Sequence, residues 1–167
     1  MRGKSSPVVS RSNRLLKLFH PLVGRWCHTI VTSYGGGLVD GDRPWLSVVC
    51  GPDTRLYLTS PGFTHVFKGT AEQHLQADLR GDAVLVCHNP PLVPHADSKL
   101  RQRSHFRLEA ESSLVVIDWL LPGRTARGEH FDYEELELEL RIECDRQLLL
   151  LDRISSRPGQ QDPCSPA

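Results

Sequence analysis

Three segments of the chain gather side chains that could do chemistry. Residues 34–42 (YGGGLVDGD) combine glycines with two carboxylates, residues 87–95 (CHNPPLVPH) combine a thiol with imidazoles, and residues 117–129 (IDWLLPGRTARGE) combine carboxylates with arginines. Carboxylate, imidazole and thiolate groups are the usual ligands of transition metals, and arginine pairs with carboxylates. Each segment therefore has a metal-binding or partner-binding interpretation, which has to be weighed against a purely structural one.

The glycine-rich segment is not a nucleotide-binding loop. It lacks the Gly-Lys-Ser/Thr of a Walker A loop, and its last glycine falls one residue too late for the G-x-G-x-x-G pattern. Its glycines permit positive φ angles and close backbone approach; they are Gly35, Gly36, Gly37 and Gly41. Asp40 and Asp42 either stabilise the resulting turn or offer oxygen ligands to an ion. Both interpretations stay open, and the turn is the simpler one.

The arginine-containing segment predicts a loop held together by ion pairs. Gly123 and Gly128 flank the arginines Arg124 and Arg127, and Glu129 follows directly. Because the guanidinium fork favours bidentate pairing with a carboxylate, we expect an ion-pair cluster that holds the loop between two strands. A polar surface for a partner is the alternative. An ion-pair cluster that holds the loop explains the two arginines better than it explains Glu129.

An enzymatic interpretation would use Asp118 and Glu129 as paired carboxylates of a hydrolase. No His-Ser-Asp or Cys-His arrangement with a recognisable local context accompanies them. Asp118 also lies in an apolar strand pattern, which favours a structural role. The sequence therefore predicts a protein that is not an enzyme.

The third segment brings Cys87 and His88 within nine residues of His95. Imidazole and thiolate suit nickel or zinc. The intervening prolines impose an extended geometry, however, and the spacing matches no known site. We expect Cys87 to be a small core residue instead.

Composition narrows the classes of partner. The chain carries 20 basic and 20 acidic residues, with no acid in positions 1–39 and a mostly acidic stretch at 129–145. It matches no nucleic-acid module, and no apolar run reaches the ~18 residues of a membrane span. Its five cysteines are scattered without a C-x-x-C pair, which indicates a reducing compartment. We expect a soluble, cytoplasmic protein with no nucleic-acid or membrane partner; a mitochondrial transit peptide at the Arg-rich start is the alternative.

Apolar alternation with a period of two dominates the chain. In residues 131–145, Leu136, Leu138, Leu140 and Ile142 alternate with charged residues, which predicts a long half-buried strand with these four side chains facing inward. Further strands are expected at 28–34, 44–50, 55–60, 65–68, 73–79, 83–88, 106–110 and 114–117. Turn signals such as GPD, SPG, RGD and NPP separate them. The pattern predicts a mainly antiparallel all-β fold, and no internal repeat is evident.

Length and composition predict one domain with two unstructured ends. We expect a disordered basic segment at 1–14, a β domain at 15–154, and a disordered tail at 155–167, which is rich in proline and nearly free of apolar residues.

These segments, taken in order, resemble the urease accessory protein D family, UreD, also called UreH. The resemblance rests on 35–42 (GGGLVDGD), 56–67 (LYLTSPGFTHVF), 90–94 with Gln102, and above all 116–129 (VIDWLLPGRTARGE) running into Phe131 and Tyr133. The last segment is similar to that of eukaryotic members. The match covers residues 15–154 and resembles the central part of the family domain, with both flanks missing. In the loop 61–65, PGFTH stands where relatives often carry a Gln-Ala/Gly-Ser/Ala-Thr-Lys run.

The resemblance implies a function as well as a fold. It implies an incomplete, multi-stranded UreD-like scaffold that binds apo-urease and accessory protein F, is joined by the accessory GTPase G, and helps nickel reach the urease active site through an internal polar passage. No cofactor is expected to be tightly bound, although nickel could bind transiently. Asp40, Asp42 and Glu129 are the carboxylates proposed for the transient path, and the glycines, arginines and Asp118 named above form the structural or partner-binding motif. The alternative is a UreD-derived protein-interaction module that no longer serves urease.

Overall fold

The computed structural model describes residues 3–12 and 15–160, which form three β-sheets. The first large sheet has the strand order β1 (Leu16–Phe19), β2 (Cys27–Ser33), β5 (Arg55–Thr59), β8 (Val84–His88) and β11 (Ser113–Ile117). The second large sheet has the order β13 (Gln147–Ser156), β12 (Glu135–Cys144), β10 (Ser98–Leu108), β7 (Gly69–Leu79) and β4 (Trp45–Cys50). The small sheet consists of β3 (Gly37–Leu38), β6 (Thr64–Val66) and β9 (Leu92–Pro94).

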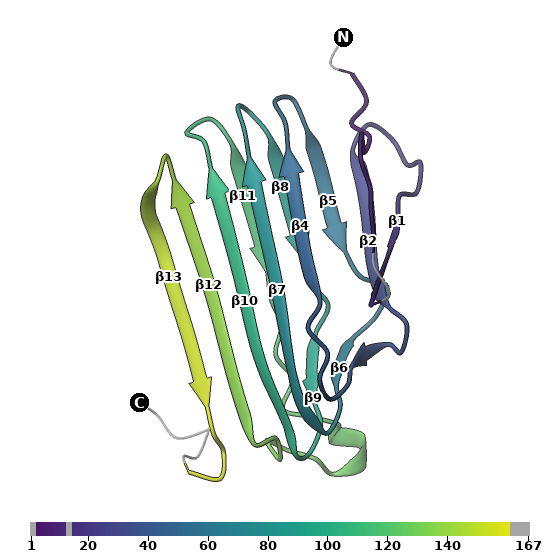
Figure 1. Cartoon of the computed structure of the whole chain (residues 1–167), viewed down its shortest axis with the longest axis vertical. Helices are drawn as coiled ribbons and strands as arrows, with labels where there is room; N and C mark the ends of the chain where they lie inside the picture. Colours follow the sequence, from purple (N-terminus) through teal and green to yellow (C-terminus); the bar gives the residue numbers. More distant parts are fainter. Residues whose placement is uncertain (1–2, 13–14, 161–167) are drawn as a thin grey trace.

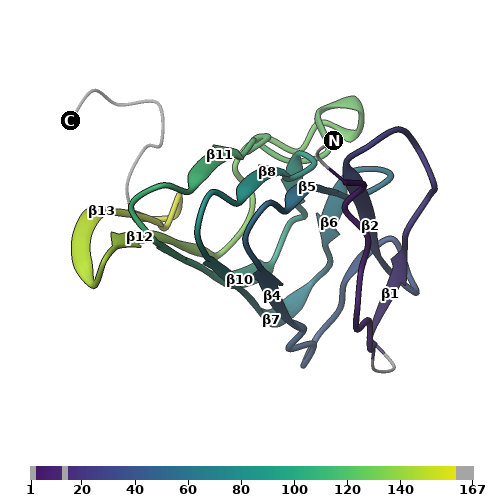
Figure 2. The same cartoon turned by 90° about the horizontal axis from the view of Figure 1, so that it is seen from above.

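The chain visits the three sheets in rotation and so winds into a parallel solenoid. One coil runs through β2, β3 and β4, the next through β5, β6 and β7, and the third through β8, β9 and β10. A fourth coil contains β11, a bridge between Leu92 and Leu120, the 3-10 helix η1 (Thr125–Arg127) and β12. The two large sheets face each other, and the small sheet closes one end of the space between them (Figures 1 and 2). Every named strand pairing is parallel except β1–β2 and β12–β13.

The prediction of an all-β protein is confirmed, but the prediction of mainly antiparallel pairing is wrong. Turn signals mark where a strand ends, yet they do not say whether the chain turns back beside that strand or crosses to another sheet. Here each connection crosses to another sheet, and the next strand in the same sheet is one full coil further on. A coil therefore serves as the long crossover that parallel pairing requires.

The structure also contains a repeat that the sequence does not reveal. Cys27, Leu56, Leu85 and Leu114 occupy equivalent inward positions in successive coils of the first large sheet, each 29 residues after the one before. The prediction of no internal repeat was therefore wrong at the level of structure. A solenoid repeat is set by backbone register, and different apolar residues can fill the same position.

Most predicted strands are present with small shifts at their ends, but the strand expected at 106–110 is only the last part of β10, which begins at Ser98. The strand expected at 131–145 is β12, which begins later, at Glu135. Its inward face is as predicted: Leu136 is fully buried, Leu138 packs against one core cluster, and Leu140 and Ile142 pack against the other. Sequence reasoning missed β1, β3, β9 and β13.

Apolar side chains fill the solenoid in two separate clusters. The larger cluster lies between the two large sheets, with Leu85, Cys87, Ala77 and Phe106 completely buried. The smaller one lies toward the small sheet; its buried members are Leu38, Val66, Ala71, Leu92, Leu100, Tyr133 and Leu136.

The disorder predicted for the two ends stays a prediction. In the first segment, residues 3–12 contain no strand. The Ser5 backbone nitrogen donates a hydrogen bond to the Arg25 carbonyl, and the Ser5 hydroxyl accepts one from the Arg55 backbone nitrogen. Residues 1–2 and 13–14 lie outside the described part of the chain. In the tail, β13 extends to Ser156 and a turn follows, while residues 161–167 are again outside the described part.

Candidate functional site

A band of polar side chains crosses the interior of the solenoid between the two apolar clusters. Gln73 of β7 and Gln102 of β10 stand in register on the inward face of the second large sheet. They occupy positions in strands that otherwise point apolar or small side chains inward, such as Ala71, Leu75 and Leu100. An inward polar residue in a buried strand weakens the apolar core, so a pair of them at one level is a candidate site.

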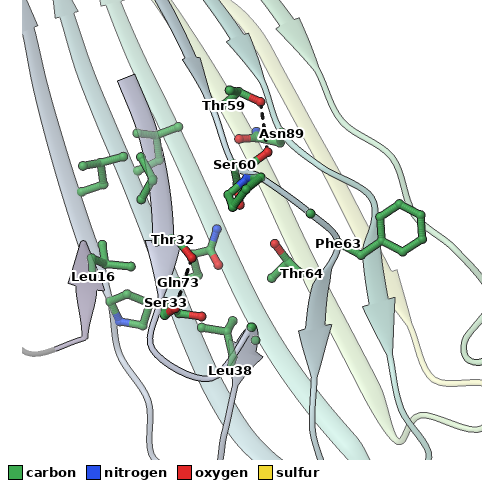
Figure 3. A pocket seen from close by; sticks show the side chains of 18 of the residues that line it. Leu16, Thr32, Ser33, Leu38, Thr59, Ser60, Phe63, Thr64, Gln73 and Asn89 are labelled. Atoms are coloured by element: carbon green, nitrogen blue, oxygen red, sulfur yellow. Dashed lines mark hydrogen bonds between the residues drawn. The ribbon is translucent and has the colours of Figure 1, made fainter. Parts of the chain in front are cut away.

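Two cavities lie along this band. The first, of ≈ 260 Å³, extends from the glycine-rich turn at Gly36 and Gly37 to Gln73 (Figure 3). The second, of ≈ 320 Å³, extends from Gln73 past Gln102 and the buried Ser104 toward β13. Both cavities are lined by the same three polar residues, Thr64, Gln73 and Asn89. The polar band therefore runs lengthwise through the stacked coils, from the first coil to the last.

Carboxylates collect at the far end of the band. The second cavity is lined by Asp118, Glu139 and Asp152, and its lining contains no lysine, arginine or histidine. Asn89 donates a hydrogen bond of 2.6 Å from Nδ2 to Asp118 Oδ1, which orients this exposed carboxylate at the cavity wall. Glu139 accepts a bond of 2.8 Å from Arg153 Nε. Because Arg153 neutralises Glu139, the negative charge at this cavity comes from Asp118 and Asp152, and it favours a cation.

The band does not form a closed metal site. Within the described residues there is no group of three or more His, Cys, Asp or Glu side chains placed to hold a metal ion. The ligand atoms that the band offers are amide, hydroxyl and carboxylate oxygens, which bind a divalent transition-metal ion more weakly than thiolate or imidazole does. This arrangement suits an ion in transit and not a tightly held one.

Asp40 and Asp42 are occupied by backbone hydrogen bonds. Asp40 Oδ1 accepts from the Thr70 backbone nitrogen at 2.8 Å, and Asp42 Oδ2 accepts from the Val39 nitrogen at 2.9 Å. Neither residue lines the two cavities. The turn-stabilising interpretation of the glycine-rich segment therefore matches the geometry. Their role in a metal path stays a hypothesis.

The arginine loop is held by the predicted ion pair. Arg124 donates from Nε to Glu129 Oε2 at 2.8 Å and from Nη2 to Glu129 Oε1, so the pair is bidentate. Because Arg124 stabilises the charged carboxylate, it lowers the pKa of Glu129 below the ordinary value of a glutamate. Gly123 has a φ of +134° and lies against the Pro94 and Glu129 carbonyl oxygens, so a larger residue does not fit there.

The other two residues of this motif, Arg127 and Gly128, lie at the end of η1. Gly128 ends η1 in the left-handed conformation, with a φ of 80°. Arg127 lies in the last turn of η1, and no ion pair joins it to a described residue. The expected cluster of two arginines and one glutamate is therefore a single Arg124–Glu129 pair.

Cys87 is a core residue, as expected. Its side chain is fully buried, and burial raises the pKa of its thiol to about 12. Burial likewise raises the pKa of Cys50 to about 11. Thiols with such pKa values stay protonated at neutral pH and are poor metal ligands. Elsewhere in the third segment, His88 is hydrogen-bonded to the Tyr57 hydroxyl at 2.8 Å, Asn89 lines both cavities, and His95 is buried beside His65.

Sequence reasoning missed most of the polar band. Asp118 was named as a motif residue, and Gln102, Thr64 and Asn89 lie in segments quoted for a motif or for the resemblance, but none of these three was given a role in a site, and Gln73 was only the start of a predicted strand. The available signal was a polar residue interrupting an inward apolar series, as in Ala71-x-Gln73-x-Leu75. That signal acquires meaning only when coil stacking places Gln73 beside Gln102.

The fold and the site thus define an all-β solenoid with a band of polar side chains in its interior. The chain belongs to the family of the UreD urease accessory protein, whose family model matches residues 7–167. A protein from Cytophaga hutchinsonii named urease accessory protein UreD is 33% identical over 99% of this chain and 60% of its own length. UreD proteins from an Anaeromyxobacter species and from Staphylococcus aureus are 30% and 31% identical, over 96% and 78% of this chain.

The chain spans 60%, 56% and 48% of the lengths of these three relatives. Among the described residues, no helix is long and apolar enough to cross a membrane.

Proposed function

We propose that this chain is a non-catalytic scaffold of urease maturation that guides nickel toward the urease active site. The polar band inside the solenoid is the single observation that carries this proposal. A band of oxygen ligands flanked by apolar clusters provides a route on which a cation exchanges its water shell for protein oxygens and regains it at the end. In this interpretation nickel is cargo, and no cofactor is tightly bound.

The route runs along the solenoid axis. One end lies at the glycine-rich turn, where Gly36 and Gly37 line the first cavity. The other end lies among Asp118, Glu139 and Asp152. Rising negative charge from the neutral amides of Gln73 and Gln102 to these carboxylates favours movement of a cation toward the β13 end.

We propose accessory protein F, the accessory GTPase G and apo-urease as the partners, in a complex formed in the cytoplasm. The family membership supports this proposal. The ends of the route are where partners have to dock, because an ion that leaves the solenoid must pass directly into the next protein. The exposed apolar residues beside the second cavity, Trp119 and Leu120, suit such an interface.

Asp40, Asp42 and Glu129 can join the route only if their present bonds open. Their carboxylates are engaged by Thr70, Val39 and Arg124, respectively. They are secondary candidates, and Asp118 comes first among the carboxylates because it lines the second cavity and is oriented there by Asn89, which lines both cavities.

The test is nickel delivery in cells that produce urease, the other accessory proteins and variants of this chain. Asp118→Ala and the double variant Gln73→Leu/Gln102→Leu should lower the nickel content of purified urease, while binding to accessory protein F stays intact. Asp78→Asn is the matched control, because Asp78 pairs with Arg107 on the outer face of β7. Glu129→Ala and Asp42→Ala should have smaller effects. Normal nickel content in stable, complex-forming variants of the band would refute the proposed route.

The second candidate is a UreD-derived interaction module that no longer serves urease. The chain spans about half the length of these relatives, so their whole-protein activity is not carried over to it and this module stays the alternative. Copurification from the native source distinguishes the two functions: urease subunits in the complex support the maturation scaffold, and their absence from an otherwise stable complex supports the module.

A further inference from the structure

The outer side of the first large sheet is mostly apolar. Alternate residues of β2, β5, β8 and β11 fill the larger core cluster, so the residues between them point outward. In the described part of the chain, no strand packs on this side of the sheet (Figure 2). We call this surface the outer apolar face; its apolar members are Phe19, Ile30, Val84, Val86, Val115 and Ile117.

The opposite outer surface, on the second large sheet, is built from charges. The outward residues of β10 are lysine, arginine or histidine, and β12 contributes four outward glutamates. Ion pairs such as Arg101–Glu137 and Arg107–Asp78 join these residues across the strands. The outer apolar face has no acidic residue at an outward strand position. Since both surfaces belong to the same coils, the fold does not require an uncharged one, and its composition indicates contact with another surface.

The outer apolar face has the size of an interface centre. Five strands spaced ~4.8 Å apart, with about five residues of ~3.3 Å each, cover roughly 19 by 17 Å, or about 300 Å². A stable interface buries about 800 Å² on each partner, so the contact must extend beyond the strands. Exposed apolar residues are available at both margins: Leu22 and Val23 lie between β1 and β2, and Trp119 follows β11.

A hydrogen-bond donor in the middle of this face has no acceptor. The Tyr57 hydroxyl lies 2.8 Å from His88 Nδ1. If Tyr57 donates, the neutral imidazole of His88 carries its hydrogen on Nε2; if His88 donates from Nδ1, the Tyr57 hydroxyl hydrogen is free. In either tautomer, one donor of the pair has no partner among the described residues. A surface that covers the face must therefore supply an acceptor.

The charge of the face is positive. Lys17 stands opposite Thr32 at the β1 margin, with its ammonium 3.8 Å from the centre of the Tyr34 ring. No ion pair joins Lys17 to a described residue. Arg55, in contrast, is neutralised by Asp82 at 2.9 Å. Lys17 and His88 both lie toward the end of the face where β2, β5 and β8 finish, so an approaching carboxylate is attracted to that end.

We propose that the outer apolar face docks an amphipathic helix of a partner protein, with its apolar side on Val86 and Val115 and its carboxylates toward Lys17 and His88. An added strand would bind a sheet edge and not a face, whereas helices cover the faces of parallel sheets. A helix of about 12 residues spans the ~17 Å length of the strands. A second copy of the chain would present the same face with a second Lys17 and no carboxylate to meet it.

The inference rests on the proposed function for its probes, which are purified accessory protein F, accessory GTPase G and apo-urease. Each is titrated against the immobilised full chain by interferometry. The partner that supplies the helix should bind Val86→Glu at least about tenfold more weakly than the wild type, and Val86→Lys should lose less because lysine attracts carboxylates. Lys17→Glu should bind roughly threefold more weakly. The matched control is Gln76→Glu, on the outer side of β7, which should bind normally. Circular dichroism confirms that every variant is folded.

The outcomes separate this surface from the polar band. Equal affinity of every partner for the wild type and folded Val86→Glu would overturn the docking surface and leave the proposed function in place. A larger loss in Val86→Lys than in Val86→Glu would overturn the acidic helix. Loss of self-association instead of partner binding in Val86→Glu would overturn the helix in favour of a second copy. If no partner binds the wild type, the surface falls together with the proposed partners. Asp118→Ala should bind normally, so a failed nickel route leaves this surface standing.

Discussion

The middle coils of the solenoid bury their inward apolar side chains, whereas the last strand, β13, leaves its apolar side chains exposed to water. In the middle, β7 and β8 have a parallel neighbour on each side, and the facing residues Ala77, Leu85 and Phe106 are completely buried. At the end, β13 extends the second large sheet past β12, while β11 is the edge of the first. The large apolar side chains of β13 are 37–64% exposed; they are Leu148, Leu149, Leu150, Leu151 and Ile154.

The difference shows how a solenoid obtains its stability. Each coil is buried by the next, so interior coils need no special sequence beyond inward apolar residues, whereas a terminal coil needs a cover. Among the described residues no strand of the first large sheet lies opposite β13, and the run of leucines in β13 is exposed. We infer that the middle coils carry the stability of the fold and that the end provides surface for contact. The predictions below test this division.

The largest effect should follow from a cavity in the middle coils. Phe106→Ala removes a fully buried ring from the larger cluster and should lower the free energy of unfolding by about 3–5 kcal/mol. Leu149→Ala, on an exposed position of β13, should change it by less than about 0.5 kcal/mol. Urea denaturation of both variants measures the contrast, and equal losses would contradict the division between middle and end.

A charged side chain on the inward face of β12 tests the region between the middle coils and the exposed end at β13. Leu138 lines the second cavity and packs against the smaller cluster, so Leu138→Asp should destabilise the fold by at least ~2 kcal/mol. Its neighbour Glu139 makes a surface pair with Arg153, and Glu139→Gln should cost less than about 1 kcal/mol. Thermal unfolding followed by circular dichroism compares them. A silent Leu138→Asp would mean that the cavity admits the carboxylate and its water.

The open end should make the purified chain self-associate. An edge strand with four consecutive leucines is a template for pairing with another chain. The double variant Leu149→Lys/Leu151→Lys should shift the chain toward monomer without lowering its stability. Size-exclusion chromatography with light scattering at rising concentration measures this shift. A wild-type chain that stays monomeric at high concentration would show that the end is already covered.

The smallest expected effect is a pH dependence of the free energy of unfolding that arises from His95 in the third coil. Burial lowers the pKa of His95 in the folded protein, so the unfolded chain binds a proton more readily. The stability that neutral His95 contributes is therefore complete above the ordinary histidine value of 6.5 and declines as the pH falls below it. Urea midpoints at pH 7.5 and 5.5 should differ more in the wild type than in His95→Phe. Identical differences would remove His95 as the source.

The alternation of residues was enough to predict much of the local structure. The inward face of β12 followed from the period-two pattern, because successive side chains of a strand point to opposite faces whatever its partner is. The Arg124–Glu129 pair followed from the affinity of a guanidinium for a nearby carboxylate, and the burial of Cys87 from its apolar neighbours. The motifs also carried the resemblance that the family match confirms.

Tertiary structure alone decided which strands are neighbours and which polar residues share a cavity. A period of two fixes the face of a strand but not its partner, so parallel coils and hairpins have the same alternation. Gln73 and Gln102 are 29 residues apart, and separately each resembles a solvent-facing residue. They become a polar band because one coil of chain returns each strand to the same place, one level further along the solenoid. Likewise, Gly37 could be predicted to permit a turn, but only the packing of β3 on β6 shows that it makes room for His65.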